Sequence, residues 1–230
     1  MRIDLLLNGP LGAWALEQVN AERVLCVHSP SEAICARARH LGMAALCGDV
    51  NDGVDVVGEV GLSVHYPYLL GKRALGRYRR LYNLHPGLLP WGRGYYPVFW
   101  ALWAGEPAGC TLHLVDEGVD TGAVVAQRSV PAYAWDTGGT LHERVSEAEK
   151  GLFLEYWPRI ASGQEMSTRP REGPGSHHLR REFMALKESG GGGVSDGDLL
   201  RLVRCLSHPQ YTGLEVCLGG RKYELSVREL

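Results

Sequence analysis

Short apolar runs alternate with helix-like segments along the first half of the chain, and this alternation limits what the chain can fold into. The predicted strands are 3–7, 24–28, 43–46, 61–65 and 81–84. The predicted helices between them are 11–20, 31–41 and 72–78, with Ser29 or Ser31 available as an N-cap. This order predicts an α/β fold in which helices cover a mostly parallel sheet. In such sheets, ligands bind outside the carboxyl ends of the strands.

The second half of the chain has a different character. Its predicted elements are a helix over 97–103, strands over 110–115 and 123–130, and an amphipathic helix over 141–160. Residues 161–178 are rich in Ser, Gly, Pro and charge, and the run at 189–193 is Ser-Gly-Gly-Gly-Gly. We therefore predict a main domain over 1–163 and a small C-terminal extension over 164–230. The extension is expected to hold a helix over 196–206 and a β-hairpin over 213–227.

The run N-L-H-P-G-L-L-P at 83–90 lies where the last of these early strands ends. Pro86 has no amide hydrogen, so it ends the ladder directly after His85. Side chains alternate along a strand, so Asn83 and His85 emerge on the same face while Leu84 points into a core. We expect both polar side chains at the open rim of the sheet.

A second run, V-D-E-G-V-D-T-G at 115–122, follows the alternating segment 110–115. Gly118 and Gly122 allow a tight loop that presents Asp120 toward the imidazole of His85. An amide, an imidazole and a carboxylate together suit acyl transfer. Taken singly, the three are better explained as a turn former, a packed histidine and an Asx-turn residue. Their combination favours a site.

Composition narrows the classes of protein that fit. The chain has 230 residues, 45% of them hydrophobic, which is enough for a substantial core. Its formal net charge of −2 gives no electrostatic reason to expect nucleic acid as a partner. The six cysteines have no C-x-x-C spacing, so neither a metal site nor a disulfide framework is indicated. The first apolar run is too short for a signal sequence or a membrane span, so we expect a cytoplasmic protein without membrane association.

The two motifs together resemble the formyltransferases that use 10-formyltetrahydrofolate as co-substrate. The likeness extends through R-G-Y-Y-P-V-F-W-A-L at 93–102, G-E-P-A-G-C-T-L-H at 105–113 and D-T-G-G-T-L at 136–141, and it covers about 60–165. Gly87 departs from the family, where a serine often follows the proline. The resemblance implies a Rossmann-like formyltransferase domain over 1–163, and it assigns the extension to sugar-nucleotide binding or dimerisation.

The resemblance also implies roles for particular residues. His85 would donate to the developing oxyanion, Asn83 would orient the formyl carbonyl, and Asp120 would stabilise the imidazolium and receive or relay the amine proton. Which group accepts the proton is left open. The residues implied at the folate site are His65, Tyr66, Pro67, Tyr68, Leu70, Arg93, Gly94, Val115, Asp116 and Gly118. The segment 62–70 is equally consistent with a strand that ends in an aromatic-proline turn.

The extension resembles the C-terminal segment of bacterial sugar N-formyltransferases, which implies a dTDP-linked 3- or 4-amino-dideoxy sugar as acceptor, in O-antigen or lipopolysaccharide biosynthesis. The residues assigned to this acceptor are Tyr95, Tyr96, Trp100, Arg204 and Tyr211. Aromatic residues before a helix, such as Tyr95 and Tyr96, are more often core anchors, and Arg204 and Tyr211 are equally consistent with a surface arginine and a packed tyrosine. A homodimer is expected from the exposed edge of the hairpin. The alternatives are an aminoacyl or other small amine acceptor, formyltetrahydrofolate hydrolysis, and a catalytically silent binding module.

Overall fold

The structure is a computed structural model that describes residues 3–52, 58–211 and 213–227. The chain divides into two compact units built from interleaved segments. Unit 1 comprises Met1–His85, Thr111–Arg128 and Glu149–Arg171, and unit 2 comprises Pro86–Cys110, Ser129–Ala148 and Glu172–Leu230. These units differ from the two consecutive stretches predicted from the sequence, because 86–110 and 129–148 group with the C-terminal part.

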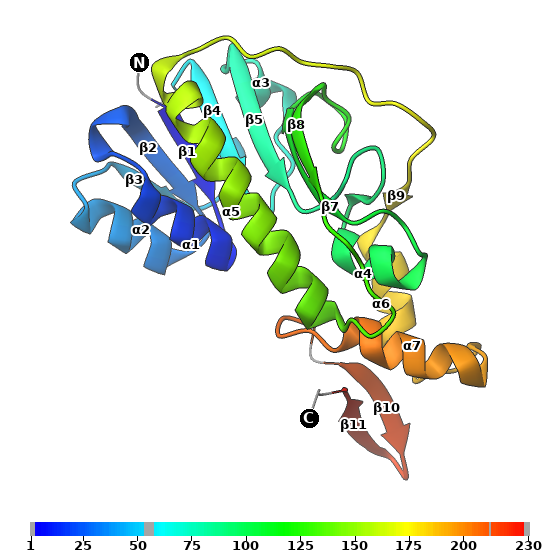
Figure 1. Cartoon of the computed structure of the whole chain (residues 1–230). Helices are drawn as coiled ribbons and strands as arrows, with labels where there is room; N and C mark the ends of the chain where they lie inside the picture. The colour runs from blue at the N-terminus through cyan, green and yellow to red at the C-terminus, as the bar shows by residue number, and fades with distance from the viewer. Residues whose placement is uncertain (1–2, 53–57, 212, 228–230) are drawn as a thin grey trace. The chain divides into compact units, whose positions relative to one another are not determined.

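A seven-stranded sheet is the framework of unit 1 (Figure 1). Its strands are β1 (Ile3–Leu7), β2 (Val24–Ser29), β3 (Ala45–Cys47), β4 (Val60–Val64), β5 (Arg80–His85), β7 (Gly109–Leu114) and β8 (Val124–Ser129). Their order is β3-β2-β1-β4-β5-β7-β8. The first five strands are parallel, whereas β7 runs antiparallel to β5. The predicted α/β fold with a mostly parallel sheet is confirmed.

Burial explains the composition of the central strands. Every residue of β1 and β4 is buried, as expected for strands that are covered on both faces, and all but Asp4 and Ser63 are apolar or glycine. The helices of this region are α1 (Gly9–Gln18), α2 (Glu32–His40), α3 (Lys72–Leu75) and the long α5 (Gly138–Ser162), of which 149–162 belongs to unit 1. Trp14 of α1 meets Phe153 of α5 edge to face, with ring centroids 5.6 Å apart.

The start of α2 and the end of α3 can be compared with the helix boundaries predicted from the sequence. The Ser31 hydroxyl accepts a hydrogen bond from the Ile34 amide at 3.5 Å, which confirms Ser31 as the N-cap of α2. The helix predicted over 72–78 ends sooner, at Leu75. Tyr78 lies outside it and donates its hydroxyl to Asp4 at 3.2 Å.

The segment after α5 returns along the β8 edge of the sheet. Val124 and Arg169 form an isolated antiparallel bridge, and the Arg169 guanidinium donates to Gln127 at 2.6 Å. Arg80 forms an ion pair with Glu165. These contacts give ordered partners to a stretch whose composition suggested a flexible linker.

Unit 2 has small elements of its own. They are α4 (Pro97–Trp103), β6 (Arg93–Gly94), β9 (His177–His178), α6 (Arg180–Glu188), α7 (Asp196–Leu206), β10 (Leu214–Leu218) and β11 (Arg221–Leu225). The helix predicted over 196–206 and the hairpin are present, with β10 and β11 paired antiparallel. Helix α6 was not predicted, because R-R-E-F-M-A-L-K-E carries few apolar residues beside the flexible glycine run. Phe183 anchors α6 and is fully buried.

Candidate active site

The C-terminal end of β5 carries the first two polar residues of the site. Asn83 pairs in register with Ser63 of β4 on one side and with His113 of β7 on the other, and His85 pairs with Thr111. Directly opposed residues share a face of the sheet, so Asn83, His85 and His113 lie on one face. Asn83 is half-buried and His85 is buried. His113 therefore joins Asn83 and His85 on the face that strand alternation predicted for them, although the sequence did not single it out.

Asp120 joins these groups from the loop between β7 and β8. Its Oδ2 lies 3.7 Å from His85 Nδ1, and its Oδ1 lies 3.5 Å from His113 Nε2. The Asp120 side chain is 13% exposed, so the carboxylate stands at the surface of an otherwise buried cluster. The predicted convergence of an amide, an imidazole and a carboxylate is present within unit 1, with a second imidazole beside it.

His113 has a defined protonation pattern when its ring is neutral. Its Nδ1 lies 2.7 Å from the Leu114 carbonyl, which can only accept, so Nδ1 carries the hydrogen. Its Nε2 then accepts from the Asn83 amide at 3.2 Å. This bond fixes the Asn83 amide, and it turns the Asn83 carbonyl oxygen away from His113. A proton on Nε2 would instead make it a donor toward Asp120.

The Asp120 loop is held at several points. Asp116 Oδ1 accepts from the Gly118 amide at 3.0 Å and from the Thr121 hydroxyl, so the carboxylate of Asp116 closes its own loop. Arg171 Nε donates to the Thr121 carbonyl at 2.9 Å. A Cβ at Gly122 would lie 1.7 Å from the Leu114 carbonyl oxygen, so this position requires glycine. These contacts hold Asp120 at φ 50°, a left-handed conformation that is costly for a residue with a side chain.

The end of β4 carries a second histidine–carboxylate pair. His65 Nε2 lies 2.9 Å from Glu149 Oε1, and Glu149 is fully buried. Burial alone lowers the pKa of His65, but the charge of Glu149 and its hydrogen bond outweigh burial, so the pKa of His65 is raised. His65 also has a positive φ of 54°. The residue predicted at the folate site is thus tied to helix α5 by a charged contact.

The other residues predicted at the folate site divide by burial. In unit 1, Tyr66, Leu70 and Val115 pack on the hydrophobic cluster of Leu6, Val50, Ala74 and Leu81. The Tyr66 hydroxyl accepts from the Val50 amide at 2.8 Å and donates to the Gly48 carbonyl at 3.2 Å. Pro67, Tyr68, Asp116 and Gly118 are exposed. Arg93 and Gly94 belong to unit 2, where Arg93 Nε donates to the Ser176 carbonyl at 3.1 Å.

Most residues predicted to bind the acceptor fill an aromatic cluster of unit 2. Tyr96 stacks on Phe183 at 3.8 Å, and Tyr211 stacks on His208 at 3.9 Å. Trp100 is buried against His178 at 4.1 Å and donates its Nε1 to the Tyr95 carbonyl at 3.1 Å. Tyr95 is exposed. The structure thus gives these aromatic residues packing contacts, and their part in acceptor binding stays a prediction.

The described ranges contain no group of three or more His, Cys, Asp or Glu side chains placed to hold a metal ion. Among the same residues, none of the helices has the length and apolar character that crossing a bilayer would require.

Known proteins share both the motifs and the fold. Residues 49–156 match the model of the formyl transferase family, and this stretch contains Asn83, His85, His113 and Asp120. This match confirms the resemblance to formyltransferases drawn from the motifs. A dTDP-4-amino-4,6-dideoxyglucose formyltransferase of Mycobacterium bovis is 30% identical over 154 residues, a match that covers 64% of each protein. The chain thus matches less than two thirds of that relative's length.

Two solved structures extend the comparison. A sugar N-formyltransferase from a Shewanella species superposes with a TM-score of 0.82 at 23% identity, covering 100% of this chain and 98% of that one. At this identity the likeness concerns the fold. The formyltransferase PseJ from Anoxybacillus kamchatkensis is 25% identical with a TM-score of 0.57, covering 86% of this chain and 93% of that one. It was solved with UDP-4,6-dideoxy-4-formamido-L-AltNAc and tetrahydrofolate.

Proposed function

We propose that this protein transfers the formyl group of 10-formyltetrahydrofolate to the amine of a dTDP-linked 3- or 4-amino-dideoxy sugar. The observation that carries the proposal is the convergence of Asn83, His85 and Asp120, with Asp120 Oδ2 3.7 Å from His85 Nδ1, at the carboxyl end of β5. The acceptor is chosen because the relative from Mycobacterium bovis is a dTDP-amino-sugar formyltransferase and PseJ holds a formamido sugar nucleotide with tetrahydrofolate.

The reaction asks for three functions that these side chains have. The amine nitrogen attacks the formyl carbon and forms a tetrahedral intermediate, whose oxygen gains negative charge. A protonated His85 donates a hydrogen bond to the oxygen of this intermediate and so stabilises it. Asn83, whose side-chain amide is held by His113, orients the formyl carbonyl. When the bond from carbon to N10 breaks, the proton lost by the amine must reach N10. Asp120 is the group placed to take this proton and return it.

The geometry of the cluster is consistent with these roles of His85, Asn83 and Asp120. Asp120 lies between two imidazoles, with its carboxylate oxygens 3.7 Å from His85 Nδ1 and 3.5 Å from His113 Nε2. His113 donates its Nδ1 hydrogen to a backbone carbonyl, so its role is to position the side chain of Asn83. His85 is then the imidazole that faces the reacting carbonyl.

A transfer assay tests the proposal directly. The protein is incubated with 10-formyltetrahydrofolate, with and without a panel of dTDP-linked 3- and 4-amino-dideoxy sugars, while tetrahydrofolate release and formylated sugar are measured by absorbance and mass spectrometry. Sugar-dependent release with a formamido product supports the proposal. Release that is independent of sugar indicates hydrolysis, and an absence of turnover with every acceptor contradicts the proposal.

We further propose a cytoplasmic homodimer. The six cysteines are free, as is usual in a reducing compartment. One face of the C-terminal hairpin carries Leu218, Tyr223 and Leu225, which are 65%, 48% and 42% exposed, and such an apolar face suits pairing with a second copy. Sedimentation of wild type and of Tyr223→Glu tests the dimer. Equal monomeric behaviour of both proteins contradicts it.

A further inference from the structure

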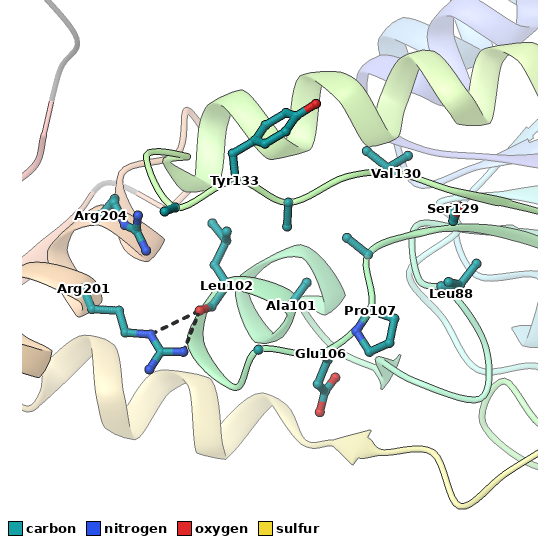
Figure 2. A pocket seen from close by; sticks show the side chains of 14 residues that line it. Leu88, Ala101, Leu102, Glu106, Pro107, Ser129, Val130, Tyr133, Arg201 and Arg204 are labelled. Carbon is teal, nitrogen blue, oxygen red and sulfur yellow. Dashed lines mark hydrogen bonds between the residues drawn. The ribbon is translucent and has the colours of Figure 1, made fainter.

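Glu106 and Glu149 both pair with a histidine, but they differ in how the second carboxylate oxygen is satisfied. In unit 2, Glu106 lines a cavity of about 580 Å³ (Figure 2), and it accepts from His178 Nε2 at 2.8 Å and from the Ser176 hydroxyl at 2.9 Å. In unit 1, Glu149 Oε1 lies 2.9 Å from His65 Nε2, whereas its Oε2 is buried and has no hydrogen-bond partner among the residues that the structure describes. An unpaired oxygen on a fully buried carboxylate costs stability, so the presence of Glu149 indicates a role other than stability.

The contact with Glu149 determines which ring nitrogen of His65 is left for a ligand. A carboxylate can only accept, so His65 Nε2 carries a hydrogen in both the neutral and the protonated ring. Nδ1 has no partner within the ranges 3–52, 58–211 and 213–227, and the side chain is 21% exposed. Nδ1 is therefore a hydrogen-bond acceptor when the ring is neutral and a donor when the ring is protonated.

His65 lies at the edge of the sheet that carries the active-site residues of β5. Strands β4 and β5 are parallel, and Val64 pairs in register with Leu84. His65 and His85 follow these two residues directly, so the chain leaves β4 beside His85. The positive φ of His65, 54°, turns the chain out of the sheet at this point. His65 thus begins the loop 65–70 at the rim where the candidate active site lies.

The loop after β4 is also held further along. Asn51 Nδ2 donates to the Leu69 carbonyl at 2.8 Å, and Asn51 Oδ1 accepts from the Gly71 amide at 2.8 Å. Lys72 forms an ion pair at 3.1 Å with Glu117, which belongs to the loop between β7 and β8. Within unit 1, the loops after β4 and β7 thus lie next to each other at the rim. A ligand bound there meets a loop whose first residue is fixed by a buried contact with α5.

We propose that Glu149 is a positioning residue for the folate co-substrate, because it holds the His65 ring so that Nδ1–H donates to a carbonyl oxygen of the folate. The inference rests on the proposed function, since the ligand is the formyl donor of that reaction. Burial lowers the pKa of His65, but the charge of Glu149 and its hydrogen bond outweigh burial, so the pKa is raised and the ring keeps its second hydrogen to higher pH. A neutral ring would instead present the lone pair of Nδ1 to the carbonyl oxygen, which repels it.

The affinity for folate should therefore depend on pH through His65. The charged groups on the elements around this loop are His85 and Asp120 at the end of β5, Asp49 and Asp52 in the segment before β4, and Lys72 and Glu117, which pair with each other. Wild type and Glu149→Gln share all of these groups, so a difference between their pH profiles reports the pair of His65 and Glu149. Wild type should lose affinity above pH 6.5, as pH rises through the raised pKa of His65. In Glu149→Gln, burial acts without an opposing charge, and the loss should move below pH 6.5.

Calorimetric titration with 5-formyltetrahydrofolate, whose formyl group is not on N10, tests the proposal between pH 6 and pH 9 without any formyl transfer. Glu149→Gln retains the size and an acceptor oxygen but removes the charge, and we expect it to weaken binding about 10-fold near pH 7. The matched control is Glu155→Gln, which removes the same charge from the same helix, where Glu155 pairs with Arg128 at the surface, and it should bind as wild type does. Glu149→Asp, which retains the charge, should keep the pH profile of wild type.

Three results would overturn the proposal. They are parallel pH profiles for wild type and Glu149→Gln, an equal loss of affinity in Glu155→Gln, and, in the transfer assay, a loss in Glu149→Gln that appears in kcat rather than in KM for the folate. If Glu149→Gln does not fold, His65→Asn serves as the test, because asparagine tolerates the left-handed backbone and does not titrate, so its profile should lack the step above pH 6.5.

These experiments separate the inference from the proposed function. An absence of folate binding by wild type would refute both. Folate binding that depends on Glu149, with no transfer to any nucleotide sugar, would refute the proposed function and leave the role of Glu149 standing. Transfer with a KM for the folate that Glu149→Gln leaves unchanged would refute only the role of Glu149.

Discussion

His208 in unit 2 has different surroundings from the four histidines near carboxylates in unit 1. In unit 1, His28, His65, His85 and His113 each lie within 3.7 Å of a carboxylate oxygen. In unit 2, His178 also lies 2.8 Å from a carboxylate, that of Glu106, whereas His208 is buried against His142 and Tyr211, with ring centroids at 4.4 and 3.9 Å. Its Nδ1 accepts from the Gln210 amide at 3.0 Å, so the nitrogen that would take a proton already holds a donor. Unit 1 thus places carboxylates beside four of its imidazoles, and unit 2 keeps His208 away from any such charge.

This contrast follows from how each unit is built. A parallel sheet collects the ends of its strands at one edge, where polar side chains can meet and still reach water. In unit 2, short helices and loops pack aromatic rings around His208, and burial followed by the nearby His142 lowers its pKa to about 3. The first arrangement suits proton transfer, whereas the second supports a rigid wall for binding.

The largest effect is expected at the carboxylate that the two imidazoles of the active site share. Asp120→Asn retains the size of the side chain but removes its charge and its ability to take a proton, so we expect kcat to fall about 1,000-fold. Steady-state formyl transfer measures the loss, and the melting temperature serves as the control for folding. Wild-type turnover in Asp120→Asn would show that this residue takes no part in the mechanism. It would also contradict the view that the arrangement in unit 1 serves proton transfer.

The two units also differ in how much of their functional residues could be predicted from the sequence alone. Asn83 and His85 could be placed because a strand that ends at Pro86 fixes their common face, and Asp120 because glycines mark its loop. His113 was missed, because a histidine in an alternating strand has no signal of its own. Only the antiparallel register that sets it opposite Asn83 reveals its part in the site.

The cavity of unit 2 was beyond the reach of the sequence for a similar reason. Leu88, Val130 and Arg204 come from three separate stretches, and no local pattern records that they share a wall. The resemblance assigned both Arg204 and Tyr211 to the acceptor, but Tyr211 lies in the aromatic cluster. The residue types suggested what each side chain could bind, and only their packing in the structure distinguishes the two residues.

The pH dependence of stability should have opposite signs at His65 and His208. The raised pKa of His65 means that its pair with Glu149 contributes stability below the unfolded value of 6.5, and this contribution is lost as pH rises through the folded pKa. His65→Asn tolerates the left-handed backbone and should cost about 2–3 kcal/mol at pH 6, below the about 3–5 kcal/mol of a fully buried pair. Chemical denaturation at pH 6 and pH 9 measures the difference. Equal losses at both pH values would contradict a charged pair, and His40→Asn at an exposed site is the control.

His208 should behave in the reverse way. Its folded pKa of about 3 lies below the unfolded value of 6.5, so the unfolded chain binds more protons between these values and stability falls as pH drops below 6.5. At pH 5 the cost is on the order of 2 kcal/mol. His208→Asn retains an acceptor for the Gln210 amide and removes this titration, so between pH 7.5 and pH 5 it should lose about 2 kcal/mol less than wild type. Parallel denaturation curves for the two proteins at both pH values would show that His208 is not kept neutral by the fold.

The smallest effect is expected at Arg171, which acts on the site through the Asp120 loop. Its Nε donates to the Thr121 carbonyl at 2.9 Å, while Asp116 and Gly122 hold the same loop at other points. Arg171→Met should therefore lower kcat only about 10-fold, less than the roughly 100-fold that a 1 Å misplacement can cost. Because the loss arises from the position of Asp120, KM for the folate should change little, and Arg171→Lys should recover part of kcat by donating to the same carbonyl. Arg169→Met is the matched control, since Arg169 bonds Gln127 on the neighbouring strand, and an equal loss in both variants would point to general loosening of this edge of the sheet.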